Sequence, residues 1–404
     1  MGYAGRPISV ATLPRLLVYA GYSAVIVGRD MHQAPTNEPY GYQTRIRGST
    51  YVAGDDYDTF LKRSAPESGG IRSLVEKLGL SNNGWAAQPW PLAEELHPTA
   101  WIVGQARKVL KEIANDRPLF LTASFFAPHP PLFPPKRIFD FYWRQQLPPP
   151  AHGDWVDWGA LSTKGDKPGH RVLLNGDTLR AALAGYFGLI QHLDEQIAPL
   201  IDEFKERSRK AKRPWLIVFT SDHGEMLGDH GFFRKCEPYE GSANIPFLIA
   251  GSPELGFRLG LRSQQTVCLE DIMPTLLELA AAKCPEVDGR SLVAVLRGEK
   301  RNIRDQLHFE HAVCYSQEQA FHALTDGHAK YIWRPAGGTE QLFDLDKDPR
   351  EEHDLSRDDA ARPGLEQWRA RMTKRLAGRP EGFSDGVRLI PGRPYPPLQA
   401  RTGK

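Results

Sequence analysis

The sequence predicts an α/β protein with a mixed, mostly parallel sheet flanked by helices and a small antiparallel sheet near its C-terminus. Short apolar runs of strand length alternate with helical patterns as far as residue 281. The alternation then stops, and residues 306–345 show short strand patterns separated by turns. With 404 residues, the chain is long enough for a large α/β core and a smaller second unit.

The first helix and strand are predicted from local signals. Thr12 can cap a short helix, Pro14 is tolerated in its first turn, and Gly21 can end it. The apolar run that ends at Gly28 reads as a strand. Residues 33–98 are rich in Gly, Pro and Asp and are predicted to be irregular. The elements predicted next are a helix over 99–114, a strand over 119–125, a Pro- and Trp-rich loop over 128–170, a helix over 179–204 that bends near Pro199, strands over 215–219 and 245–250, and a helix over 271–281.

The C-terminal third is predicted to differ from the rest. Its strand patterns cover residues 306–310, 319–324, 329–333 and 341–345. The last 30 residues are rich in Pro, Gly and Arg and are predicted to be extended or loosely packed. We therefore expect an α/β domain over 1–300, an antiparallel subdomain over 301–375 and a tail over 376–404.

Bulk composition excludes several classes of protein. The net charge is +2, so nothing calls for nucleic acid or an acidic membrane surface as a partner. No apolar run approaches the roughly 20 residues of a membrane span. The N-terminus has no apolar secretion core, and the four cysteines form no Cys-x-x-Cys pair. On this sequence we expect a cytoplasmic protein.

A candidate site follows the strand predicted over 215–219. Asp222 and His223 come directly after it, at the position where ligands collect in open α/β sheets. A carboxylate and an imidazole side by side can bind a divalent cation, and Lys235 can return from the following loop to neutralise an anion. An Asp-His pair alone is as well explained by a helix cap or a loop ion pair.

Polar groups also follow two earlier strands. Arg29 and His32 come after the first strand, and His129 comes after the strand predicted over 119–125. If these strands and the one before Asp222 are parallel, their ends lie on one edge of the sheet and converge. A single histidine at such a place is more often structural, but three of them together with a lysine favour a site.

These motifs, in this order, resemble the sulfatase family of the alkaline phosphatase superfamily. The resemblance runs from about Thr12 to about Leu355 and implies an alkaline-phosphatase-like fold. The matching segments are Thr-Leu-Pro-Arg-Leu-Leu at 12–17, Val-Gly-Arg-Asp-Met-His at 27–32, Pro-His-Pro-Pro at 128–131, Thr-Ser-Asp-His-Gly-Glu at 220–225, Leu-Gly-Asp-His-Gly at 227–231 leading to Lys235, Ile-Pro-Phe at 245–247, Asp-Gly-Arg-Ser-Leu at 288–292 and Leu-Phe-Asp-Leu at 342–345.

The resemblance implies hydrolysis of sulfuric esters at a divalent metal. Asp222 and His223 would be metal ligands, with calcium the usual ion of the family and manganese or zinc possible because imidazole suits a softer ion. Lys235 and His129 would bind the sulfate or phosphate oxygens. The partner implied is a small-molecule sulfate or phosphate ester.

Two further roles come from the segment at 27–32. His32 would transfer a proton or assist the leaving group. Arg29 stands where the family usually has lysine, and an arginine can grip an anion but cannot supply a proton. The spacing from Arg29 to His32 is one residue longer than in the usual motif.

Two parts of the family's machinery have no match in the sequence. One is a first strand ending in an acidic pair, and the other is the Cys- or Ser-x-Pro-x-Arg segment that supplies the nucleophile. We therefore expect a chain that begins after the nucleophile helix. The acidic run at 54–58 is a weak replacement metal site and more simply a solvated loop.

Three interpretations stay open. The chain is part of a sulfatase, or of a phosphonate monoester or phosphodiester hydrolase of the same superfamily. Otherwise it is a non-catalytic anion-binding relative, or a structural remnant that pairs with another chain. A nucleotide-binding protein and a serine hydrolase rank lower, since neither Gly-x-Gly-x-x-Gly nor Gly-x-Ser-x-Gly is present. Trp143, Trp155 and Trp158 suit either an aryl or sugar ring or, slightly better, packing of their own loop.

Overall fold

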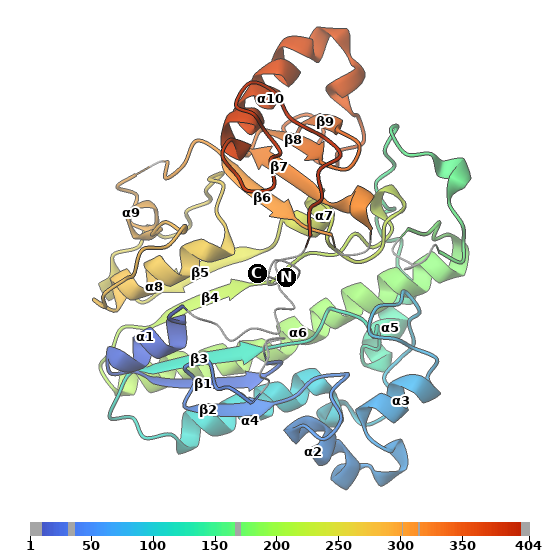
Figure 1. Ribbon diagram of the computed structural model, residues 1–404. Coiled ribbons are helices and arrows are strands. Elements are labelled where there is room, and N and C mark those ends of the chain that lie inside the picture. The colour runs from blue at the N-terminus through green and yellow to red at the C-terminus, as the bar shows by residue number, and fades with distance from the viewer. Residues whose placement is uncertain (1–9, 31–36, 166–170, 301, 314–315, 397–404) are drawn as a thin grey trace.

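The computed structural model describes residues 10–30, 37–165, 171–300, 302–313 and 316–396. Its strands form three sheets that are stacked from bottom to top in Figure 1. The lowest is a parallel sheet in which β1 (Ser23–Gly28) lies between β2 (Thr44–Arg47) and β3 (Leu119–Ser124). The predicted first strand and the strand after residue 119 are therefore confirmed as parallel neighbours.

The middle sheet corrects a prediction. β4 (Leu216–Thr220) does not continue the parallel sheet but pairs antiparallel with β5 (Phe247–Gly251). Among the described residues, no strand pairs with the edge of β3 away from β1 or with the edge of β4 away from β5. β4 still runs in the same direction as β1 and β3 (Figure 1), and its partner was not predicted because an apolar run identifies a strand without identifying its partner. β3 and β4 are also less buried than β1.

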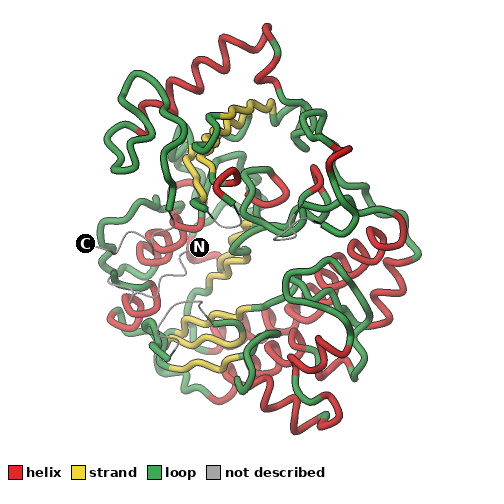
Figure 2. Tube along the Cα trace, turned by 45° about the vertical axis from the view of Figure 1, so that its right-hand side comes forward, coloured by secondary structure: helices red, strands yellow, loops and turns green. Residues whose placement is uncertain are grey.

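Two helices cover the parallel sheet. α4 (Pro98–Glu112) buries its apolar side against β1 and β3, with Trp101 and Ile102 in the core beside Val25 and Val27. The long α6 (Gly176–Lys210) packs against α4 and α5 (Lys136–Trp143) and continues through Pro199 as one helix. Figures 1 and 2 show α6 running along the length of the α/β part.

The predicted irregular stretch 33–98 holds structure that the sequence analysis missed. Besides β2, it contains α2 (Asp56–Ser64) and α3 (Ile71–Lys77). Its acidic run is not a solvated loop. Asp55 caps α2 by accepting the backbone N–H of Asp58 at 2.8 Å, and it is only 4% exposed. Asp58 accepts the backbone N–H of Ile71 at 2.9 Å, so these carboxylates join two helices.

Shorter helices complete the α/β part. The predicted lead-in helix is α1 (Leu13–Tyr19), although the Thr12 hydroxyl donates to the carbonyl of Tyr40 rather than capping it. The remaining helices are α7 (Glu240–Ala243), α8 (Ile272–Leu279) and α9 (Val293–Leu296). No helix in the described residues is long and apolar enough to cross a membrane.

The upper part of Figure 1 is the predicted antiparallel sheet, and α10 (Arg362–Leu376) packs on it. Its strands follow chain order and are β6 (Leu307–His311), β7 (Phe321–Thr325), β8 (Ala329–Arg334) and β9 (Thr339–Asp344). The tail predicted to be extended or loosely packed forms no helix or strand in its described part beyond α10, but two aromatic residues anchor it. Phe383 is fully buried and Tyr395 is 6% exposed, both within the core under α10.

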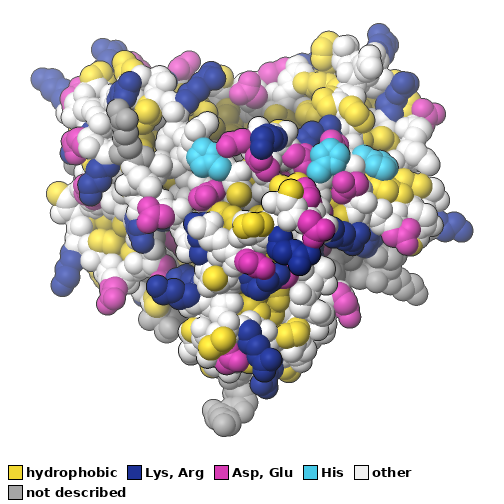
Figure 3. Space-filling model, turned by 90° about the horizontal axis from the view of Figure 1, so that it is seen from above, with side chains coloured by type: hydrophobic (Ala, Val, Ile, Leu, Met, Phe, Trp, Pro, Cys, Tyr) yellow, Lys and Arg dark blue, Asp and Glu magenta, His cyan; other side chains and the backbone are white. Residues whose placement is uncertain are grey.

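A buried lysine ties the C-terminal sheet to the α/β part. The Lys330 ammonium on β8 lies 2.8 Å from a Glu351 carboxylate oxygen and 2.5 Å from one of Glu240, and it donates to the Pro238 carbonyl. Lys330 and Glu351 are each 1% exposed. Elsewhere charges of both signs are interspersed on the surface, as the face in Figure 3 shows.

Replacing Lys330 tests how strongly this cluster holds the two parts together. Lys330→Met leaves Glu351 buried without its cation, so we expect the free energy of unfolding to fall by about 3 kcal/mol or more. Urea titration of the full chain measures the change. Lys347→Met is the matched control, because the side chain of Lys347 is 85% exposed in its pair with Asp344 and should contribute less than about 1 kcal/mol. Equal losses in the two variants would contradict this assignment.

A buried histidine on α6 predicts a loss of stability in acid. His192 is fully buried, and burial lowers its pKa from 6.5 to about 4 although Glu94 lies 3.5 Å away. Below pH 6.5 the His192 imidazole binds a proton in the unfolded chain, whereas in the folded protein it does so only near pH 4. Stability present above pH 6.5 is therefore lost as the pH falls through this window, by on the order of 3 kcal/mol. Urea unfolding of His192→Leu should show a shallower acid slope, and an unchanged slope would refute the linkage.

Candidate functional site

The site is built on the loop that follows β4. The amides of Gly224 and Glu225 donate to the carbonyls of Ser242 and Gly241 at 2.8 and 2.7 Å. A side chain at Gly224 would place its Cβ 2.2 Å from the Gly241 oxygen, so glycine is required by this close approach. The Asp-His-Gly sequence therefore turns sharply against the segment that begins α7.

Asp222 and His223 present two donor atoms at the start of this loop. His223 Nδ1 lies 2.7 Å from the Gly224 carbonyl and donates to it, which leaves the Nε2 lone pair facing Asp222 Oδ1 at 3.7 Å. Burial lowers the pKa of the His223 imidazole. Burial alone would raise the pKa of the Asp222 carboxyl, but His223 and Arg29 bring it below its ordinary value. A carboxylate and a neutral imidazole nitrogen form a pair suited to a cation.

Arg29, which directly follows β1, lies next to Asp222. Its Nη1 donates to Asp222 Oδ2 at 3.2 Å, and its guanidinium lies over the Phe126 ring at 5.5 Å. The backbone is held close here, because a Cβ at Gly28 would meet the Ser124 oxygen at 2.0 Å. The strand ends thus converge as predicted, although β4 belongs to another sheet.

His129 and Lys235 form the closest pair of the site. Lys235 Nζ lies 2.6 Å from His129 Nε2, while His129 Nδ1 donates to the Pro130 carbonyl at 2.8 Å. Burial, with help from Lys235, lowers the pKa of His129 to about 3, so its Nε2 is a lone pair that accepts from the ammonium. Burial also lowers the pKa of Lys235, which is 8% exposed. The His129 and His223 ring centroids are 5.8 Å apart.

Two residues that support Lys235 were not predicted. Asn83 Oδ1 lies 3.4 Å from Lys235 Nζ, and the Asn83 carbonyl accepts from Arg234 at 2.7 Å. Glu225 accepts the backbone N–H groups of Leu227 and Arg234 and so closes the loop that carries Lys235. The acid in Asp-His-Gly-Glu was a visible signal for Glu225, but Asn83 lies 152 positions before Lys235 and gave none.

The backbone on both sides of Lys235 is left-handed. Arg234 has φ of 81° and Cys236 has φ of 72°, a conformation that costs non-glycine residues of order 1 kcal/mol or more each. The hydrogen bonds of Glu225 to the backbone of Leu227 and Arg234 help to stabilise this conformation. Backbone in sparsely populated regions is common in functional loops.

The five predicted site residues that are described lie together, namely Arg29, His129, Asp222, His223 and Lys235. His32 lies outside the described residues. The site combines a guanidinium, an ammonium, two neutral imidazoles and one carboxylate. Such a set can bind a dianion such as sulfate next to a cation.

Asp222 and His223 alone supply too few ligands for a calcium ion. Calcium takes six to eight oxygen ligands, and Asp222 supplies the one carboxylate here. Within the described part of the chain, no third His, Cys, Asp or Glu joins Asp222 and His223 in a metal-binding group. An imidazole ligand fits manganese or zinc better than calcium.

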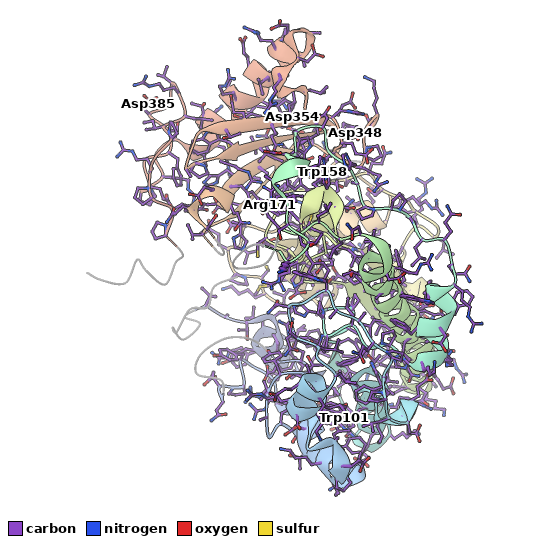
Figure 4. The ribbon with its side chains drawn as sticks, turned by 90° about the vertical axis from the view of Figure 1, so that its right-hand side faces the viewer. Trp101, Trp158, Arg171, Asp348, Asp354 and Asp385 are labelled. Carbon is purple, nitrogen blue, oxygen red and sulfur yellow. The ribbon has the colours of Figure 1, made fainter. Side chains whose placement is uncertain are left out.

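The stretch 128–170 was predicted to be a loop but contains α5, and its Trp155 and Trp158 both pack against protein groups. Trp155 stacks on Tyr239 at 4.8 Å between centroids and donates to the Glu351 carbonyl at 2.9 Å. Trp158 stacks on His152 and donates to the Gly153 carbonyl. Figure 4 shows Trp158 and Arg171 between the C-terminal sheet and the long helix. A cavity of about 430 Å³ opens there, lined by Trp155, Val156, Asp157, Ala160, Leu161, Ser162 and Arg171.

Two protein-family models match the chain. The model of the family described as "Sulfatase" matches residues 1–282. A second model, "N-sulphoglucosamine sulphohydrolase, C-terminal", matches residues 228–378. The two matches overlap across Lys235 and together cover most of the chain.

Two similar individual proteins are also sulfatases by name. An arylsulfatase of Clostridium perfringens is 34% identical over 395 residues, which cover 94% of this chain and 81% of the relative. A choline-sulfatase of Rhizobium meliloti is 30% identical, over 85% of this chain and 66% of the relative.

Solved structures share the fold. The phosphonate monoester hydrolase of Agrobacterium radiobacter aligns with a TM-score of 0.72 and 23% identity, over 91% of this chain and 81% of that one. A protein solved in complex with its substrate D-glucosamine-2-N,6-O-disulfate aligns with a TM-score of 0.65 and 18% identity, over 91% of this chain and 82% of that one.

Inorganic sulfate tests the anion site directly. We expect sulfate to raise the thermal midpoint of the full chain, by the equivalent of about 2.7 kcal/mol at 100 times its Kd. Lys235→Met should weaken this effect strongly, whereas the exposed Lys347→Met should keep it. Differential scanning fluorimetry at constant ionic strength, with chloride as the reference anion, makes the measurement. An equal shift in both variants would place sulfate elsewhere.

Proposed function

Because the chain belongs to the sulfatase family, we propose that the cluster around Lys235 binds and cleaves sulfate monoesters. The observation that carries the proposal is the 2.6 Å approach of Lys235 Nζ to His129 Nε2 beside Asp222 and His223. Unlike Lys330, which is paired with two carboxylates, the Lys235 ammonium contacts a neutral imidazole and an amide oxygen, which suits it to bind an anion. The arylsulfatase and choline-sulfatase relatives support a sulfuric ester as the substrate.

Lys235 and Arg29 stabilise the negative charge of the sulfate group and of the leaving oxygen. Arg29 pairs with the Asp222 carboxylate at 3.2 Å, while the Lys235 ammonium contacts the neutral His129 ring and can turn to an anion. Arg29 keeps its charge throughout because a guanidinium does not deprotonate in proteins. Hydrogen-bond donors fixed in this way favour the transition state more than the ground state.

His129 positions the ammonium of Lys235 through its Nε2 lone pair. A sulfate dianion bound beside it favours its protonated form, which can then donate from Nε2 to a sulfate oxygen. His32 is assigned proton transfer to the leaving group. None of these residues is assigned as the nucleophile, since no Cys- or Ser-x-Pro-x-Arg segment occurs in the sequence.

The sulfatase family implies a divalent metal site, and Asp222 and His223 are the residues that would hold the ion here. Calcium is the ion expected from the family, while the imidazole of His223 supports manganese or zinc. A bound divalent cation would draw charge from the sulfate oxygens. Metal analysis of the purified chain and of Asp222→Asn identifies the ion.

Phosphonate or phosphodiester hydrolysis is the second candidate. It is favoured by His223, since relatives that act on phosphorus often have histidine at this position. The fold shared with phosphonate monoester hydrolases is compatible with either substrate and decides nothing between them. The site charges suit both a sulfate and a phosphonate group.

Turnover of paired aryl substrates tests both candidates. We expect this chain, once joined to a Cys- or Ser-x-Pro-x-Arg nucleophile segment, to cleave 4-nitrophenyl sulfate with a higher kcat/KM than a 4-nitrophenyl phosphonate. Lys235→Ala should lower kcat/KM by about 10²-fold or more, because one charge stabiliser is lost. Lys347→Ala is the control and should stay within about twofold.

Each other outcome has a definite meaning. A preference for the phosphonate would replace the first candidate with the second. Unchanged turnover in Lys235→Ala would remove this residue from the mechanism. Sulfate binding without turnover of either ester would make the chain a non-catalytic anion binder.

A further inference from the structure

Three potential metal ligands meet on the C-terminal sheet, which does not contain β4 or Asp222. His308 and Glu310 are two positions apart on β6, so their side chains leave the same face of the strand. The register pairs Glu310 directly with His322 on β7. One donor atom from each of these side chains lies within 4.8 Å of the other two.

We propose that His308, Glu310 and His322 bind a zinc-class divalent cation. His308 Nε2 is 3.2 Å from His322 Nδ1, which is 2.9 Å from Glu310 Oε2, and His308 Nε2 is 3.8 Å from the same oxygen. A tetrahedral zinc ion with bonds of about 2.0–2.1 Å separates its ligand atoms by roughly 3.3 Å. The three distances bracket that value, and the fourth position is left to water.

The chemistry of the three donors suits a cation. Burial lowers the pKa of both imidazoles, that of His308 to about 3, and so favours the neutral form that can offer a lone pair. Burial alone would raise the pKa of Glu310, but His322 and Arg379 bring it down to about 2, so its carboxylate is ionised. Two imidazoles with one carboxylate favour zinc, cobalt or nickel over calcium and magnesium.

The surroundings hold the ligands in place. The Arg379 guanidinium donates to both oxygens of Glu310, at 2.8 and 3.2 Å, and also pairs with Glu381 at 3.2 Å. The ring of His322 is fully buried and stacks on Tyr395 at 4.9 Å between centroids. Outer contacts of this kind orient metal ligands.

Charge sets the strength of binding. Arg379 faces the site from beyond α10, and Arg375 on α10 acts on His308, so two cations oppose the ion. The Glu310 and Glu381 carboxylates offset them. We therefore expect weaker binding than at a zinc site made of thiolates. An ion held here would bind β6 to β7 and stabilise the C-terminal unit.

Cobalt titration of the metal-free full chain tests the site. Tetrahedral Co²⁺ absorbs strongly in the visible region, whereas six-coordinate Co²⁺ absorbs weakly. We expect one equivalent of the strongly absorbing ion, displaced by Zn²⁺. Asp222→Asn should keep this signal, which separates it from a metal at the sulfate site, and His308→Ala should lose it.

Two further variants keep the test decisive. If His308→Ala does not fold, Glu310→Gln preserves the side-chain shape and should lower zinc affinity by more than about 10-fold. His328→Ala removes an exposed histidine of the same unit and should change nothing. A wild-type chain without the tetrahedral signal would overturn the proposal. So would a signal that survives in both His308→Ala and Glu310→Gln.

Discussion

The contact between the Lys235 ammonium and His129 Nε2 sets the conditions for the rest of the site. A lysine that is 8% exposed lies against one histidine of a cluster that also contains His223 and Arg29. Among the predicted site residues, only Asp222 carries a negative charge. Burial lowers the pKa of both imidazoles, and Glu225 closes the loop that holds Lys235 while its carboxyl also acts on the ammonium. The cationic groups are thus held in place before an anion arrives.

The sequence revealed the site because polar residues stand directly after apolar runs. Arg29, His129 and Asp222 each follow a strand, and their convergence was expected on the condition that these strands run in one direction. The antiparallel pairing of β4 with β5 was not predicted, since the partner of a strand depends on the whole chain. Asn83 was missed because its contact with Lys235 spans 152 positions.

Buried charge was the other feature that local patterns could not predict. Lys330 lies in a correctly predicted strand, but its pairing with Glu351 and Glu240 depends on how two parts of the molecule meet. In the stretch 33–98, Asp55 and Asp58 cap and join helices that their composition had suggested were loops. From sequence alone, an Asp in a Gly-rich segment can belong to a loop or cap a helix, and only its backbone partners tell which.

The separation of β3 from β4 has a mechanical consequence. No hydrogen-bond ladder between described strands fixes the distance from His129 to Lys235, which lie beyond different sheets. That distance depends on side-chain contacts and on α6, a rod about 52 Å long that packs against the helices of the parallel sheet. A continuous sheet would fix this distance through its backbone hydrogen bonds. Here the distance is set instead by the direct contact between the Lys235 ammonium and His129 Nε2 and by the packing of the helices.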